Sequence, residues 1–73
     1  MGKLSGFSYR EVTRKLKTFG FQFYRVGKGD HEIWFNPTTR LKTTIPHHRE
    51  IREGTLNNIL KQAQINVEDF LKA

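Results

Sequence analysis

The chain has 73 residues, which is enough for one domain (1–73) built around one small hydrophobic core. It contains no cysteine, which excludes disulfide bonds and thiolate metal sites, and no apolar run approaches the roughly 18 residues of a transmembrane helix. The net charge is +6 at pH 7, and ten of the 13 Lys and Arg residues fall in residues 1–49 with only three of the seven acidic residues. This basic front half indicates a polyanionic partner, with nucleic acid as the leading candidate.

The first predicted element is a helix that begins after Ser8. Ser8 and Glu11 have the spacing of a capping box, in which each side chain accepts a hydrogen bond from the backbone N–H of the other residue. Gly20 is placed to end the helix in a left-handed conformation. Apolar side chains between these limits repeat at helical spacing and predict one buried face, at Tyr9, Val12, Leu16 and Phe19.

Three strand-like segments follow, at residues 21–26, 31–35 and 40–45. Each is rich in β-branched or aromatic residues, and Pro46, which cannot donate a ladder hydrogen bond, closes the third. The segments are joined by short turn sequences, and connections of this length predict an antiparallel meander.

Alternation along the second strand divides its side chains between two faces. We assign Ile33 and Phe35 to the core and expect Trp34, of opposite parity, to be exposed. A large exposed aromatic side chain is typical of a protein interface, so Trp34 is a candidate for binding a partner protein. Most other aromatic residues of the strands are expected in the core, with base stacking on the sheet as the alternative.

Residues 46–54 are polar and are expected to form a loop. A second helix is predicted from the apolar spacing of Leu56, Ile59, Leu60 and Ala63. A short third helix begins at Asn66 as N-cap. The order α-β-β-β-α-α predicts an α+β fold with a three-stranded antiparallel sheet and helices on one face, the order of the double-stranded RNA-binding domain.

Three stretches of the chain carry a more specific pattern. Gly29-Asp30-His31 opens the second strand, and Ile45-Pro46-His47-His48 ends the third. The third stretch is Gly54-Thr55-Leu56-Asn57-Asn58-Ile59-Leu60-Lys61-Gln62-Ala63. Together, in this order and at this spacing, they resemble the HicA toxin family, whose motifs are Gly-Ser-His, a Pro followed by His, and Gly-Thr-Leu-x-x-Ile-Leu-x-Gln-Ala.

This resemblance implies a compact double-stranded-RNA-binding-like domain that acts as an mRNA interferase. A cytoplasmic location is expected separately, because the sequence shows neither the apolar core of a signal peptide nor a transmembrane run. Its partners would be single-stranded or messenger RNA and a HicB-type antitoxin. Two departures from the family pattern stand out. Asp30 replaces the usual Ser, which puts a carboxylate beside His31, and Gln64 replaces a helix-ending Gly.

His31 is the predicted catalytic residue. RNA is cut when its 2′-OH attacks the adjacent phosphate, which requires a proton acceptor and a proton donor, and histidine can serve as either near neutral pH. Without the resemblance, one histidine after a glycine turn would be read as an ordinary surface residue. His47 and His48 could supply a second proton-transfer group, contact phosphate or simply occupy a loop. A zinc site of the three histidines lacks the usual ligand spacing, so no cofactor is expected.

Basic residues are the predicted RNA-binding groups. Three of them share one face of the first helix, about 120–150° from its apolar face. Such a stripe is often only a solvated surface, and the resemblance is what makes it a candidate. The full set is Arg10, Arg14, Lys17, Lys28, Arg40, Lys42 and His48. Two alternatives to a ribonuclease remain: a non-catalytic RNA-binding module that uses the same basic surface, and an interaction protein that binds its antitoxin and tunes transcription.

Overall fold

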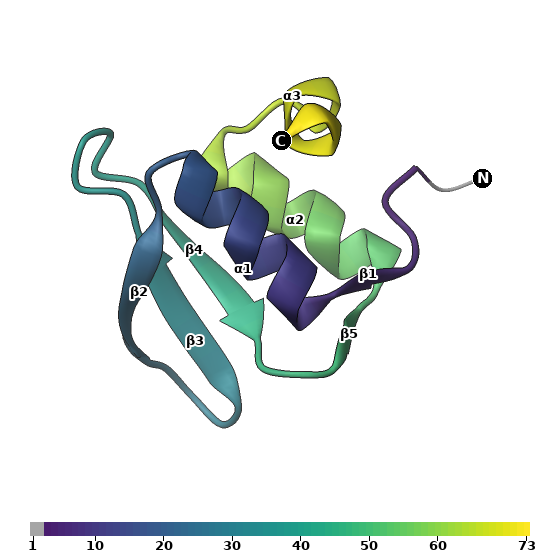
Figure 1. Ribbon diagram of the computed structural model, residues 1–73. Helices are drawn as coiled ribbons and strands as arrows, with labels where there is room; N and C mark the ends of the chain where they lie inside the picture. The colour runs from purple at the N-terminus through teal and green to yellow at the C-terminus, as the bar shows by residue number, and fades with distance from the viewer. Residues whose placement is uncertain (1–2) are drawn as a thin grey trace.

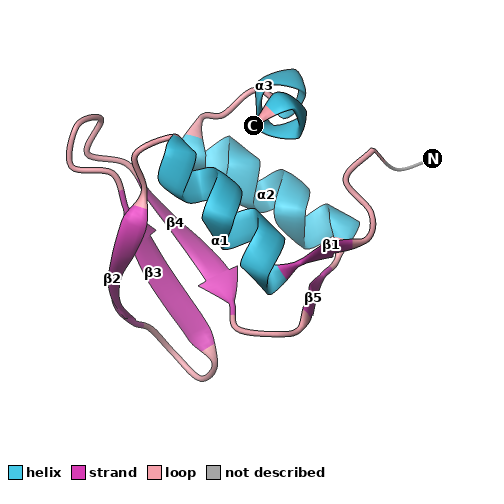
Figure 2. Ribbon diagram, viewed as in Figure 1, coloured by secondary structure: helices cyan, strands magenta, loops and turns pink. Residues whose placement is uncertain are grey.

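The computed structural model describes residues 3–73. A three-stranded antiparallel sheet in the order β2-β3-β4 forms one layer, and α1 and α2 lie side by side on one of its faces (Figure 1). Two very short strands, β1 and β5, pair beside the helices (Figure 2). The elements are β1 (Phe7–Ser8), α1 (Tyr9–Thr18), β2 (Gln22–Val26), β3 (His31–Phe35), β4 (Lys42–Pro46), β5 (Glu50–Ile51), α2 (Glu53–Ala63) and α3 (Val67–Lys72). The predicted α+β fold is confirmed.

Helix α1 has the predicted boundaries. The Ser8 hydroxyl accepts a hydrogen bond from the Glu11 N–H at 3.1 Å, and the Glu11 carboxylate accepts one from the Ser8 N–H at 2.9 Å. Gly20 has a φ of +94°, and a Cβ there would lie 3.1 Å from the Asn36 side chain. A side chain at this position would therefore be strained and crowded, which explains why the helix ends at a glycine.

The sheet follows the predicted meander with small changes. His31 pairs with Pro46 at one end of the β3–β4 ladder, and Phe35 pairs with Lys42 at the other. Strand β4 begins at Lys42, two residues later than predicted, because Arg40 adopts a positive φ of 66° in the preceding turn. The turn geometry takes that part of the chain out of the ladder.

The predicted assignment of the two faces of β3 is wrong. Trp34 is only 3 % exposed, whereas Ile33 and Phe35 are half-buried on the face away from the helices. The indole N–H of Trp34 donates a hydrogen bond to Glu32 at 3.1 Å, and the Lys17 ammonium lies 6.0 Å from the ring centroid. Because its one polar atom has a hydrogen-bond partner, burial of the indole leaves no unsatisfied donor. Trp34 is thus a core residue and is not available to anchor a partner protein.

Strand β2 carries aromatic residues that were expected in the core and are not. Phe23 is 49 % exposed and Tyr24 is 52 % exposed, although Phe21, just before the strand, is buried. Strand β2 lies at the edge of the sheet, and its register shifts between Phe23 and Arg25. An edge strand has a neighbour on one side only, so its side chains are less covered than those of a central strand.

The segment after β4 is more ordered than the predicted loop. Strand β5 pairs antiparallel with β1, and Ile51 on β5 is buried in the core. The Tyr9 N–H also donates a hydrogen bond to the Arg49 carbonyl at 3.0 Å. These contacts fix the chain between β4 and α2 against the start of α1, and so position the histidines that lie in this segment.

Helices α2 and α3 are joined as predicted, around Gln64 and Asn66. Gln64 has a φ of 56° at the C-cap of α2, a left-handed conformation that glycine adopts more readily. Asn66 caps α3 by accepting a hydrogen bond from the Glu68 N–H at 2.8 Å. Beyond it, Phe70 is fully buried against the core.

Gln64→Gly is expected to raise the free energy of unfolding by about 1 kcal/mol, because glycine removes the cost of a left-handed backbone. Urea unfolding followed by circular dichroism measures this change. Gln64→Ala is the matched control, since it shortens the side chain but keeps the Cβ atom. A glycine variant no more stable than the alanine variant would contradict the prediction.

Candidate active site

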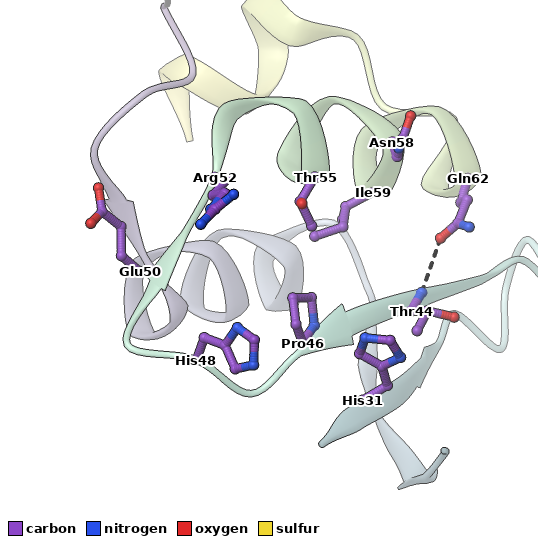
Figure 3. Close-up of a pocket in the computed structure, with 10 residues that line it drawn as sticks. All are labelled: His31, Thr44, Pro46, His48, Glu50, Arg52, Thr55, Asn58, Ile59 and Gln62. Carbon is purple, nitrogen blue, oxygen red and sulfur yellow. Dashed lines mark hydrogen bonds between the residues drawn. The ribbon is translucent and has the colours of Figure 1, made fainter. Parts of the chain in front are cut away.

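A cavity of about 410 Å³ opens between α2 and the sheet (Figure 3). Its lining comes from the start of β3, from β4, from the segment that follows β4, and from the polar face of α2. The lining residues are His31, Thr44, Pro46, His48, Glu50, Arg52, Thr55, Asn58, Ile59 and Gln62. Two of the three histidines of the chain therefore face one cavity, together with a guanidinium group that can balance an anionic ligand.

His31 is the first residue of β3, directly after the turn at residues 27–30. The turn is closed by hydrogen bonds from the His31 N–H to the Lys28 carbonyl at 3.1 Å and from the Gly27 N–H to the His31 carbonyl at 2.8 Å. The His31 side chain is exposed, and its ring lies at the floor of the cavity below α2 (Figure 3). It lies, as expected, at an accessible end of the sheet.

His48 reaches the same cavity from the segment after β4. Its Nε2 atom lies 2.5 Å from the Asp30 Oδ2 atom, and the neighbouring His47 N–H donates to the Asp30 carbonyl at 2.8 Å. The hydrogen bond with His48 lowers the pKa of the Asp30 carboxyl, which is therefore ionised at neutral pH. The sequence placed this carboxylate beside His31, but its hydrogen bond is with His48.

His47 points to the other side of the chain, as expected for adjacent residues in an extended segment. Its Nδ1 atom is 3.5 Å from the Glu32 carboxylate, and its ring centroid is 4.5 Å from that of Tyr9. It lines a second, smaller hollow of about 290 Å³, next to Arg10 and Arg49. His48 lines both hollows.

Glu32 links the first turn of α1 to β3 through hydrogen bonds. Its Oε1 atom accepts hydrogen bonds from the Tyr9 hydroxyl at 2.5 Å and from the Trp34 indole at 3.1 Å. Burial, and then the hydrogen bond to Glu32, raise the pKa of Tyr9 to about 12. Tyr9 therefore stays a hydrogen-bond donor across the physiological pH range.

The predicted RNA-binding residues do not form one cluster. His48 lines the main cavity, Arg10 lines the adjacent hollow, and Lys28 lies in the turn before His31. Lys42 pairs with Phe35, four residues along β3 from His31, which is about 13 Å in an extended strand. The other members of the set lie on exposed surface outside both hollows, at Arg14, Lys17 and Arg40.

Several polar residues of the cavity were not predicted from the sequence. Asn58 and Gln62 are four residues apart on α2, a spacing that puts both on one helix face and could have identified them. The Gln62 Oε1 atom accepts hydrogen bonds from the Thr44 N–H at 3.0 Å and from the Thr43 hydroxyl at 2.8 Å. Gln62 thus helps to fix α2 against β4 at the side of the cavity.

Within residues 3–73, no three His, Cys, Asp or Glu side chains are grouped so that they could hold a metal ion. No helix in this part of the chain is long and apolar enough to cross a membrane. The cavity is lined by imidazole, guanidinium, carboxylate, amide and hydroxyl groups.

Comparison with known proteins gives one family. The family model described as the HicA toxin of bacterial toxin-antitoxin systems matches residues 9–65, which include the cavity and both of its histidines. A search of curated proteins finds no match. Because the match spans most of the sequence, the chain belongs to the HicA family of toxins of bacterial toxin–antitoxin systems.

Proposed function

We propose that this toxin is a cytoplasmic endoribonuclease that cleaves messenger RNA with His31 as a catalytic residue. The observation that carries the proposal is the position of His31, exposed at a strand start and facing a cavity with a second histidine and Arg52. Histidine is the side chain best suited to move a proton near neutral pH. The arginine supplies positive charge where the phosphate gains negative charge in the transition state.

A purified sample incubated with a defined single-stranded RNA tests this function directly. Attack by the 2′-OH leaves a 2′,3′-cyclic phosphate on one fragment and a 5′-hydroxyl on the other. We expect both ends, with cleavage unchanged by a metal chelator. RNA that is bound but remains intact would favour the alternative, a non-catalytic RNA-binding module that uses the same basic surface.

RNA affinity is expected to be mainly electrostatic. On a single strand, each neutralised phosphate contributes about −0.7 to the slope of log K against log salt concentration. Substituting Arg10, Arg14 and Lys17 together by Gln should flatten that slope if α1 binds the RNA backbone. Filter binding at several salt concentrations measures it. An unchanged slope would shift the binding surface to the other basic residues, Arg40, Lys42 and Arg49.

We also propose that a HicB-type antitoxin inhibits the chain by covering His31 and the adjoining basic surface. The family match implies such a partner, and a site open to RNA is open to a protein. A chain of net charge +6 would attract an acidic partner quickly. The contact cannot depend on Trp34, which is buried. Competition between RNA and the antitoxin tests this, because inhibition while both are bound would rule out direct occlusion.

A further inference from the structure

We propose that His48, held by Asp30, is a second catalytic residue, which donates a proton to the leaving oxygen while His31 accepts one from the attacking hydroxyl. This assignment rests on the proposed ribonuclease function. It gives a role to His48, for which the sequence left three interpretations open: proton transfer, contact with phosphate, or a place in a loop. It also gives a role to the carboxylate that replaces the usual serine before His31.

Both imidazoles line the same cavity, where one bound RNA could contact them. His31 comes from the start of β3 and His48 from the segment after β4, yet both line the cavity below α2 (Figure 3). The Nε2 atom of His48 is engaged by Asp30 at 2.5 Å, which leaves Nδ1 as its only free nitrogen. Arg52 lines the same cavity, and Figure 3 shows the Glu50 carboxylate directed away from His31.

A hydrogen bond to a carboxylate distinguishes the two histidines. An ionised carboxylate that accepts the Nε2 proton stabilises the positively charged imidazolium, which is the form that can donate a proton from Nδ1. Asp30 provides this carboxylate to His48, whereas no carboxylate in residues 3–73 forms a hydrogen bond with the His31 ring. We therefore assign proton donation to His48 and proton acceptance to His31, with Asp30 as a positioning residue.

The reaction balances without any further reactant. A nitrogen of His31 takes the proton from the 2′-OH, and the 2′ oxygen forms a bond to phosphorus. The bond between phosphorus and the 5′ oxygen breaks, and this oxygen takes the proton from His48. The products are a 2′,3′-cyclic phosphate and a 5′-hydroxyl. His31 ends protonated and His48 neutral, and exchange with solvent restores both.

Two substrates that differ in their leaving group distinguish a loss of proton donation from a loss of substrate binding. RNA has an alkoxide leaving group that requires a proton, whereas uridine 3′-(4-nitrophenyl phosphate) releases a stable phenolate that does not. We expect His48→Ala to lower RNA cleavage by about 10²–10⁴-fold, the usual contribution of a general acid. The same variant should lower cleavage of the nitrophenyl ester less than about tenfold. Asp30→Asn should show the same pattern with a smaller loss on RNA.

Two further variants serve as references. His47→Ala removes the adjacent imidazole, which faces Tyr9 and Glu32 instead of the main cavity, and should cleave both substrates at near the unsubstituted rate. His31→Ala should lose activity on both substrates, because both need the 2′-OH to be deprotonated. Circular dichroism and thermal unfolding of each variant establish that it is folded.

The outcomes distinguish this assignment from the proposed function. If the unsubstituted protein cleaves neither substrate, the ribonuclease function itself fails and the assignment fails with it. If it cleaves RNA and the folded His48→Ala variant does so equally well, only the assignment is overturned. Equal losses on both substrates would make His48 a binding residue. Activity on the ester retained by His31→Ala but lost in His48→Ala would reverse the two roles and also overturn the proposal.

Discussion

Alanine in place of His31 is expected to reduce RNA cleavage by about 10²–10⁴-fold, the usual contribution of a general acid or base, and to remove toxicity. The side chain is exposed, and the turn before it is held by backbone hydrogen bonds that alanine also makes. The substitution should therefore leave the fold intact. Growth and the integrity of cellular mRNA after induction, together with cleavage by purified protein, measure the effect.

The best control for this substitution is His47→Ala, which removes another exposed imidazole from outside the main cavity. Each variant loses one imidazole and no other group, so the comparison controls for the loss of a histidine as such. A His31→Ala protein that is folded and cuts RNA at near the unsubstituted rate would disprove the assignment of His31.

The second large effect is expected on stability. Trp34→Ala should lower the free energy of unfolding by about 3–5 kcal/mol, because it empties a buried site the size of an indole. It also removes one of the donors to the Glu32 carboxylate. A loss of this size is a large part of the roughly 5–15 kcal/mol typical of a folded domain, and small domains lie at the low end.

Urea unfolding measures this loss, and Tyr24→Ala is its control. Tyr24 is also an aromatic residue of the sheet, but it is 52 % exposed, so its removal should cost about 1 kcal/mol or less. The outcome also bears on partner binding. If Trp34→Ala were as stable as the unsubstituted protein and lost only affinity for the antitoxin, the indole would have to be exposed in solution.

Local signals in the sequence predicted the fold well. The capping box at Ser8 and the glycine at position 20 are local signals, because each depends on residues close by in the sequence. Both ends of α1 could therefore be predicted. Strand alternation is weaker evidence, because a period of two divides the side chains of β3 into two sets without showing which set is buried. Both helices cover the face that carries Trp34, and only the three-dimensional structure shows this.

The site was predicted only in part, for a related reason. His31 was found through a short motif and a family resemblance. The pairing of Asp30 with His48 joins residues 18 positions apart, and it exists because the turn before β3 meets the chain leaving β4. No periodic pattern in the sequence indicates that these two segments are in contact. Strands β1 and β5, of two residues each, are likewise too short for alternation to reveal.

Each of the two outer strands of the sheet carries a feature that hinders pairing with another chain. An unpaired strand edge can template the addition of a foreign strand, and this is a common route to aggregation. On β4, the Thr44 N–H that such a strand would need already donates a hydrogen bond to the Gln62 carboxamide oxygen. On β2, the irregularity between Phe23 and Arg25 interrupts the regular row of donors and acceptors. Each edge is thus less suited to pairing with another strand, although exposed aromatic rings lie on β2.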